Sequence, residues 1–96
     1  MTKLIANITG RIGHISELEK AGNDQRLTLS IPEKGFNGET QWHKITAWNK
    51  VASNASKYLK KGDVVSIDFA IGYRKAEEKT YTNFTANSIT YLHTQK

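Results

Sequence analysis

The chain contains no cysteine in its 96 residues, which excludes a disulfide framework and a zinc site built from thiolates. No apolar run approaches the ~20 residues that a membrane-spanning helix requires. The first seven residues turn polar too soon for a secretory signal peptide. From these absences we expect a cytoplasmic protein that makes no membrane contact.

Recognisable catalytic patterns are also missing. The three histidines, His14, His43 and His93, are scattered along the chain, and no two stand at the i, i+4 spacing of a helical metal site. There is no nucleophile elbow, phosphate-binding loop or pair of carboxylates at a catalytic spacing. We therefore expect a protein that is not an enzyme and that uses no metal or cofactor.

The sequence does contain an excess of positive charge. Fourteen Lys and Arg residues against nine Asp and Glu give a formal net charge of +5 and a pI near 9.6. A basic surface favours polyanions such as nucleic acid, although a solvated surface that only aids solubility would have the same composition. With 38% hydrophobic residues in a chain of this length, we expect one folded domain, residues 1–96, with a small core.

The first half of the chain has the two-residue hydrophobic period of β-strands. Residues 3–18 are predicted to form a long bent strand, with Gly10 and Gly13 where the strand curls. Leu27, Leu29 and Ile31 predict a second strand that Pro32 ends. An exposed, glycine-containing loop leads to a third strand over residues 40–48.

The period then changes to that of a helix. We predict a helix from about residue 50 to 60, with Asn49 as its N-cap and Gly62 in a left-handed conformation after it. We interpret Lys57 and Lys60 as solvated helix charges and Tyr58 as packed against the end of the fold. A fourth strand over residues 64–73, a charged loop over 74–79 and a fifth strand over 80–92 follow, with an irregularity at Asn87-Ser88.

Three strands, one helix and two more strands in about a hundred residues are the pattern of an OB-fold. We therefore predict an all-β, five-stranded Greek-key barrel with its helix between the third and fourth strands.

The stretch from Thr40 to Trp48 carries the clearest functional signal. At a two-residue period, His43, Ile45 and Ala47 form a modest core face. The opposite face is not the polar face of a solvated strand, because it carries Trp42, Lys44, Thr46 and Trp48. Exposed indoles with a cation between them suit a surface that stacks nucleic-acid bases and holds a phosphate. Burial of both tryptophans in a core is the alternative.

Ordered motifs over about a third of the chain, strongest from Thr40 to Lys75, resemble the bacterial single-stranded-DNA-binding proteins. Residues 40–45, TQWHKI, resemble the T-x-W-H-(R/K)-V strand of that family. Residues 48–52, WNKVA, are similar to its aromatic-x-K-L-A motif, and residues 57–65, KYLKKGDVV, to its Y-L-x-K-G-x-x-V motif. The pair Arg74-Lys75 resembles the basic pair at the base of the family's long hairpin.

The resemblance implies sequence-independent binding of single-stranded DNA in replication, recombination or repair. It implies base stacking for Trp42 and Trp48. It implies phosphate contacts for five basic residues, Lys44, Lys50, Lys61, Arg74 and Lys75. The residue pattern itself adds weaker candidates near the same face: Lys34, Phe36, Tyr73, Lys79 and Tyr81. Tyr73 shares the parity of Ile71, which favours a core position for it.

The chain also departs from the family pattern. Ala76 stands where the family usually has a tryptophan after the basic pair. The family's flexible C-terminal extension with its acidic tip is missing, so we expect no replication partners recruited through such a tail. For His43 a structural role in the core is the simplest interpretation, and the resemblance implies a nearby subunit contact. We expect a homo-oligomer, with dimer and tetramer both open.

Two alternatives to single-stranded DNA binding stay open at this point. One is a primosome-type or RNA-binding OB protein of similar size. The other is an OB barrel that binds proteins through Trp42 and Trp48, because tryptophan is also enriched at protein interfaces. Lys44 between the two indoles favours nucleic acid.

Overall fold

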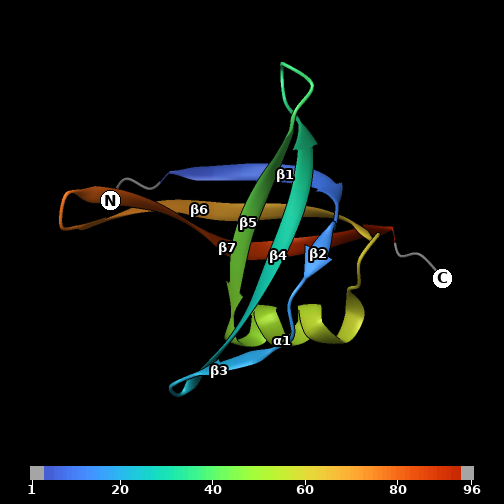
Figure 1. Ribbon diagram of the computed structural model, residues 1–96. Coiled ribbons are helices and arrows are strands. Elements are labelled where there is room, and N and C mark those ends of the chain that lie inside the picture. Colours follow the sequence, from blue (N-terminus) through green and yellow to red (C-terminus); the bar gives the residue numbers. More distant parts are fainter. Residues whose placement is uncertain (1–3, 94–96) are drawn as a thin grey trace.

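A computed structural model describes residues 4–93 of the chain as a curved β-sheet with one helix at its end (Figure 1). Its elements are β1 (Ile5–Arg11), β2 (His14–Ile15), β3 (Glu19–Ala21), β4 (Asp24–Lys34), β5 (Thr40–Trp48), α1 (Asn49–Tyr58), β6 (Val64–Ala76) and β7 (Lys79–His93). The strands pair in the order β1-β6-β7-β5-β4-β2, and β3 pairs with β4.

The bend between β1 and β2 brings the two edges of this sheet together. β1 pairs antiparallel with β6, and after Ile12 and Gly13 the chain pairs with β4 instead, through His14 opposite Ser30. The Gly13 N–H donates to the Ser30 carbonyl at 2.9 Å, so the second pairing begins at the bend itself. The result is the predicted OB barrel, with its helix between the third and fourth long strands.

The core lies inside this curved sheet and consists of residues that alternate along the long strands. β4 contributes Leu27, Leu29 and Ile31, and β5 contributes Ile45 and Ala47, each at most 1% exposed. The remaining buried members are Ile12, Ala52, Ala55, Leu59, Val65, Ile67, Phe69 and Ala86. The two-residue period therefore correctly separated the inner from the outer faces of β4 and β5.

Helix α1 closes one end of the barrel, and Ala52, Ala55 and Leu59 pack into the core. It begins one residue earlier than predicted, so the N-cap is Trp48, without a side-chain hydrogen bond, and Asn49 is the first helical residue. Asn49 has a φ of 53°, a conformation that asparagine tolerates better than most residues. Gly62 adopts the predicted left-handed conformation, with a φ of 100°.

Three predicted boundaries were wrong. The long first strand is divided into β1, β2 and β3, because the chain changes pairing partner at the bend; its first residue, Lys3, lies outside the described residues. Pro32 does not end the second strand, and it pairs with Trp42 inside β4. Ser30, two residues earlier, points its carbonyl away from β5 toward Gly13, so the Pro32 nitrogen also points away from β5 and no ladder hydrogen bond is lost.

The third wrong boundary is the charged loop at residues 74–79. β6 and β7 continue through it as a paired arm and leave only Glu77 and Glu78 in the turn. The irregularity predicted at Asn87-Ser88 is confirmed, because the β6–β7 register shifts where Ser88 pairs with Asp68 and Ala86 with Phe69. This shift bends β7 around the barrel.

Candidate nucleic-acid interface

The outer face of β5 holds the strongest cluster of candidate residues, and we call Trp42, Lys44, Thr46 and Trp48 the β5 platform. The side chain of Trp42 is 59% exposed and that of Trp48 is 36% exposed, while Ile45 and Ala47 on the opposite face are fully buried. Six residues at about 3.4 Å each separate the indoles by roughly 20 Å along the strand. The structure thus places both tryptophans outside the core.

The indole of Trp42 lies on two residues of neighbouring strands, Gly13 and Pro32, which we call the indole seat. Pro32 is its cross-strand partner on β4. A Cβ atom added to Gly13 would lie 2.5 Å from Trp42 Cζ3 and 3.0 Å from Pro32 Cδ. Because the space for a side chain at residue 13 is already filled by the indole, the ring rests directly on the backbone of the bend between β1 and β2.

Lys44 and Thr46 lie between the two indoles. Lys44 is exposed and stands opposite Ser30 on β4, and its ammonium group forms no ion pair with any residue from 4 to 93. Thr46 is half-buried because it also pairs with Thr85 of β7. The platform therefore offers one free cation between two aromatic rings, two residues from Trp42 and four from Trp48.

Trp48 stands opposite Arg26 of β4 at the other end of the platform. The Arg26 Nη2 atom lies 3.3 Å from Glu19 Oε2, and both side chains are about half exposed, so the pair contributes little to stability. The guanidinium group therefore remains accessible beside the indole.

The loop between β4 and β5, residues 35–39, carries a second aromatic candidate. Phe36 is fully exposed at its tip, and Lys34 lies at the end of β4 opposite Thr40. The loop is closed by the Gly35 N–H, which donates to the Glu39 carbonyl at 2.7 Å. Figure 1 shows this loop standing away from the barrel, beyond the Trp42 end of β5.

The paired arm of β6 and β7 carries five more candidates: Tyr73, Arg74, Lys75, Lys79 and Tyr81. The Arg74 guanidinium lies over the ring of Tyr81, 5.4 Å from its centroid, within the range of a cation–π contact. The core position favoured for Tyr73 is wrong, because the arm extends past the barrel and leaves this side chain largely exposed. The arm and the β4–β5 loop project in different directions in Figure 1.

The last two predicted phosphate contacts lie at opposite ends of α1. Lys50 is the second helical residue, next to Trp48, whereas Lys61 lies in the turn before β6. Both are exposed. The structure therefore gathers Lys44 and Lys50 with the two tryptophans and places Lys61 beyond the far end of the helix.

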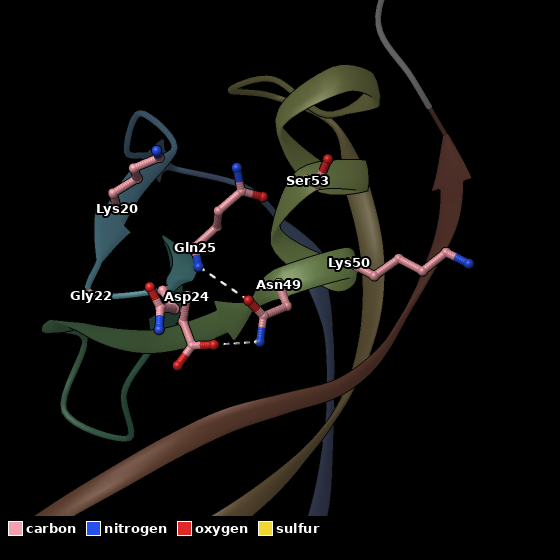
Figure 2. Close-up of a pocket in the computed structure, with 8 residues that line it drawn as sticks. Lys20, Gly22, Asp24, Gln25, Asn49, Lys50 and Ser53 are labelled. Atoms are coloured by element: carbon pink, nitrogen blue, oxygen red, sulfur yellow. Dashed lines mark hydrogen bonds between the residues drawn. The ribbon is translucent and has the colours of Figure 1, made fainter.

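A polar pocket of about 480 Å³ lies between the β3–β4 hairpin and the start of α1. Asn49 connects the helix side of the pocket to β4: its Oδ1 accepts from the Gln25 N–H at 3.1 Å and its Nδ2 donates to Asp24 Oδ1 at 3.3 Å. Figure 2 shows these hydrogen bonds, with Lys20 and Gln25 near the helix and Lys50 extending away from them. Gln25 has the parity of the inner residues of β4, so the pocket lies on the other side of the strand from the Trp48 indole.

His43 is half-buried on the inner side of β5, and its Nε2 lies 2.9 Å from Glu33 Oε1 on β4. Because the carboxylate can only accept, this ring nitrogen donates. The structure therefore gives His43 the satisfied structural contact that its core-face parity predicted.

Two features of the surface were missed by sequence reasoning. The first is Gly13 beneath Trp42, a contact between residues 29 positions apart that no local pattern reveals. The second is Tyr58, whose predicted packing was wrong, because its side chain is 61% exposed beside Tyr91. Its place on the apolar stripe of the helix suggested burial, but it lies in the last turn, where the helix passes the edge of the barrel.

Neither a metal centre nor a membrane span emerges from the described residues. Between residues 4 and 93, no three side chains of His, Asp or Glu gather where they could hold a metal ion. The one described helix is too short and too polar to cross a bilayer.

A single-stranded DNA-binding protein of Neisseria meningitidis serogroup A is 42% identical over 91 residues, which cover 85% of this chain and 52% of that protein. A Nostoc single-stranded DNA-binding protein is 29% identical over 66 residues, 66% of this chain and 56% of that protein. The chain thus spans about half the length of these relatives.

Among solved structures, the Saccharomyces cerevisiae mitochondrial single-stranded DNA-binding protein Rim1 superposes with a TM-score of 0.80 at 26% identity, over the full length of both chains. Residues 4–95 match the family described as the single-strand binding protein family. The match includes the β5 platform, the helix and the β6–β7 arm together. This chain therefore belongs to the single-strand binding protein family.

Proposed function

We propose that this chain is a nucleic-acid-binding domain that binds single-stranded DNA without regard to sequence and catalyses no reaction. Bases stack on Trp42 and Trp48, and Lys44 between them neutralises a phosphate. The observation that carries the proposal is the exposure of both indoles on the outer face of a strand whose inner face contributes the fully buried Ile45 and Ala47 to the core.

The indole seat supports this use of Trp42. Exposed tryptophan is unfavourable in water, since burial of a large aromatic side chain stabilises a fold by a few kcal/mol. Here one side of the ring is held on Gly13 and Pro32 while more than half of the side chain stays accessible. Because the indole is already held on one side, stacking a base on its open side costs little conformational entropy of the Trp42 side chain.

Basic and aromatic residues on either side of the platform would extend the contact. Lys50 lies next to Trp48, and Lys34 and Phe36 lie beyond Trp42. The arm adds Arg74, Lys75, Lys79, Tyr73 and Tyr81, and Lys61 adds a cation past the helix. These groups form an electrostatic path for the phosphate backbone, and Thr46 offers a hydroxyl between the indoles.

We propose that the chain acts in the cytoplasm, in replication, recombination or repair, where single strands need protection. The names of the relatives, all single-stranded DNA-binding proteins, support DNA as the ligand. Nothing in the platform distinguishes the sugar of DNA from that of RNA, so RNA is the competitor that the experiment must include.

The experiment is quenching of intrinsic tryptophan fluorescence by oligo(dT), repeated at rising salt. Stacking on Trp42 and Trp48 should quench the emission, and affinity should fall linearly on a log–log plot against salt because phosphate contacts release counterions. Duplex DNA of the same length should compete poorly, since its bases are already stacked and cannot reach the indoles. Equal affinity for duplex and single-stranded DNA would show that binding depends on a basic patch and not on base stacking at the platform.

Quenching by oligo(dT) would support nucleic acid rather than protein as the ligand of the two tryptophans, and weak competition by oligo(rU) would favour DNA over RNA. Tight binding of both RNA and DNA would widen the proposal to single strands in general. Absence of quenching at low salt would overturn it.

We further propose that the chain acts as a homo-oligomer, a dimer or a tetramer. β1 is at the edge of the sheet, and among residues 4–93 no strand pairs with its outer side. Leu4 and Ile5, at the start of this edge, are more than half exposed and line a cavity of about 530 Å³. An open edge with apolar side chains is stabilised by pairing with the same edge of a second copy.

His43 is the proposed contact in the larger assembly, as the family resemblance implies. Sedimentation equilibrium at micromolar concentration tests the proposal: a mass at twice or four times 10.8 kDa is expected. A monomer that still binds oligo(dT) tightly would contradict the assembly and leave the binding function intact.

A further inference from the structure

Helix α1 has an unusual charge distribution for a surface helix. From Asn49 to Lys61 the chain carries Lys50, Lys57, Lys60 and Lys61 and no acidic residue. All four lysines are exposed, and none forms an ion pair with another described residue. A helix that only needed to be solvated would usually mix both signs of charge. The helix itself carries Lys50 and Lys57, and Lys60 and Lys61 follow directly after its last residue.

The lysines of the helix follow the platform directly in the chain. Lys50, Asn54 and Lys57 stand at i, i+4 and i+7, so they lie on one face of the helix, and all are exposed. The helix begins directly after Trp48 and is ten residues long, about 15 Å. Lys50 is among the residues that line the pocket at the helix start, and Figure 2 shows its side chain pointing away from Lys20 and Gln25. A strand leaving Trp48 therefore meets cations along the helix.

At the far end of this face lies a pair of aromatic rings. The ring centroids of Tyr58, the last helical residue, and Tyr91 of β7 are 6.3 Å apart, with the planes tilted by 47°. Tyr58 is 61% exposed and Tyr91 is 40% exposed. Burial, with a further contribution from Tyr58, raises the pKa of the Tyr91 hydroxyl above its ordinary value. Tyr91 therefore carries no negative charge at neutral pH.

We propose that a single strand bound on the β5 platform continues past Trp48 along the lysine face of α1 and stacks a further base on the Tyr58–Tyr91 pair. The inference rests on the proposed function and extends it to a second stacking site. A nucleic acid is favoured over a protein partner because Lys50 and Lys57, which form no ion pair with another described residue, lead along the helix to the rings. Exposed lysines and exposed tyrosines are each common on protein surfaces. Here the β5 platform, the helix lysines and the tyrosine pair follow one another, which favours a single ligand that contacts all three.

The dimensions agree with one strand on one barrel. The platform spans roughly 20 Å and the helix about 15 Å. At the ~3.4 Å spacing of nucleotides in a duplex strand, the combined length corresponds to about ten nucleotides. This lies within the ~4–16 nucleotides that one OB-fold occupies. Short oligonucleotides can fill the platform alone, whereas longer ones reach the tyrosines.

Oligonucleotides of two lengths test the proposal, because only the longer one extends from the platform to the tyrosines. Affinities of the wild type, Tyr58→Ala and Tyr58→Phe are measured with oligo(dT) of about 4 and about 16 nucleotides. Tyr58→Ala should leave the short oligonucleotide unaffected and weaken the long one by about 5-fold or more, the effect of losing one stacked base. Tyr58→Phe keeps the ring and should bind both normally. Equal loss for both lengths, or no loss for the long one, would overturn the second site.

The unmodified protein supplies a second measurement if Tyr58→Ala does not fold. In ¹H–¹⁵N spectra, the long oligonucleotide should shift the amide signals of Lys57, Tyr58 and Tyr91, while the short one should shift only signals of the platform. Signals at the tyrosines that stay unchanged with both lengths would exclude the site. Failure of the wild type to bind either length would contradict the proposed function instead, so the two failures are distinguishable.

Discussion

Both faces of β5 carry large or apolar side chains, but the two faces differ in how far these side chains are buried. Ile45 and Ala47 are completely buried against the core, whereas Trp42 and Trp48, on the opposite face of the same strand, remain partly exposed. Both faces are held by the same backbone pairing with β4. The strand therefore separates its contribution to the core, on the inner face, from the proposed recognition of nucleic acid, on the outer face.

This separation has a structural cause. The inner face is covered by α1 and by the opposite wall of the barrel, so small and branched side chains fill it. On the outer face, only the bend at Gly13 reaches over β4 to contact Trp42. Because little else covers this face, its large side chains can be changed without opening a cavity in the core.

Truncation of the inner face should have the largest effect, and on stability. Ile45→Ala removes a fully buried side chain and should lower the free energy of unfolding by about 2–5 kcal/mol. Ile45→Val, the conservative control, should cost about 0.5–1.5 kcal/mol. Urea unfolding followed by circular dichroism measures both. If folded Ile45→Ala protein bound oligo(dT) more weakly than the wild type, the two faces would not be independent.

Truncation of the outer face should move the effect from folding to binding. Trp42→Ala should weaken oligo(dT) binding by about 1–3 kcal/mol, the contribution of one stacked base. Its free energy of unfolding should change less than that of Ile45→Ala, because more than half of the indole is exposed in the fold. Fluorescence anisotropy of a labelled oligonucleotide measures the binding. A variant that melts early yet binds normally when folded would refute the assignment of Trp42.

The division between the two faces was predictable from sequence because it depends on local alternation. Ile45, Ala47, Trp42 and Trp48 all lie on the faces that the two-residue period predicts. The succession of strands along the chain, with the helix between the third and fourth long strands, followed from the same kind of local pattern. The stacking role of the platform residues stays a prediction.

What the sequence did not predict depends on contacts between distant residues or on where an element leaves the barrel. Pro32 was predicted to end its strand, because its local effect is known and its tertiary environment is not. Tyr73 was assigned to the core by parity, but β6 continues as an arm with no core to meet. The indole seat requires Gly13 and Trp42 to be adjacent, and only the barrel brings them together.

Gly13 in the indole seat and Gly10 in β1 allow the outer face and the core to be tested separately. Gly13→Ala should displace the Trp42 indole and weaken oligo(dT) binding by at most the loss seen for Trp42→Ala, since the seat acts only through the ring. A Cβ at Gly10 would instead lie 2.9 Å from Ile31 Cγ2 in the core. Gly10→Ala, the matched control, should therefore lower stability and leave binding by the folded protein intact.

A double variant completes this test. If Gly13 acts by positioning Trp42, adding Gly13→Ala to Trp42→Ala should weaken binding no further. Additive losses in the two variants would mean that Gly13 contributes through another route and would remove the seat from the mechanism.

The smallest expected effect concerns Lys44, the cation between the two indoles. Lys44→Gln should reduce the slope of log affinity against log salt by about 0.7, the value for one phosphate on a single strand. Its effect on stability should be negligible, because the side chain is exposed and pairs with no carboxylate of the described chain. Lys20→Gln is the matched control, since Lys20 lies at the pocket on the other side of the strand from Trp48 and should leave the slope unchanged. Equal slopes for wild type and Lys44→Gln would show that Lys44 neutralises no phosphate, and that the strand crosses the platform between the indoles with its phosphates turned away from this residue.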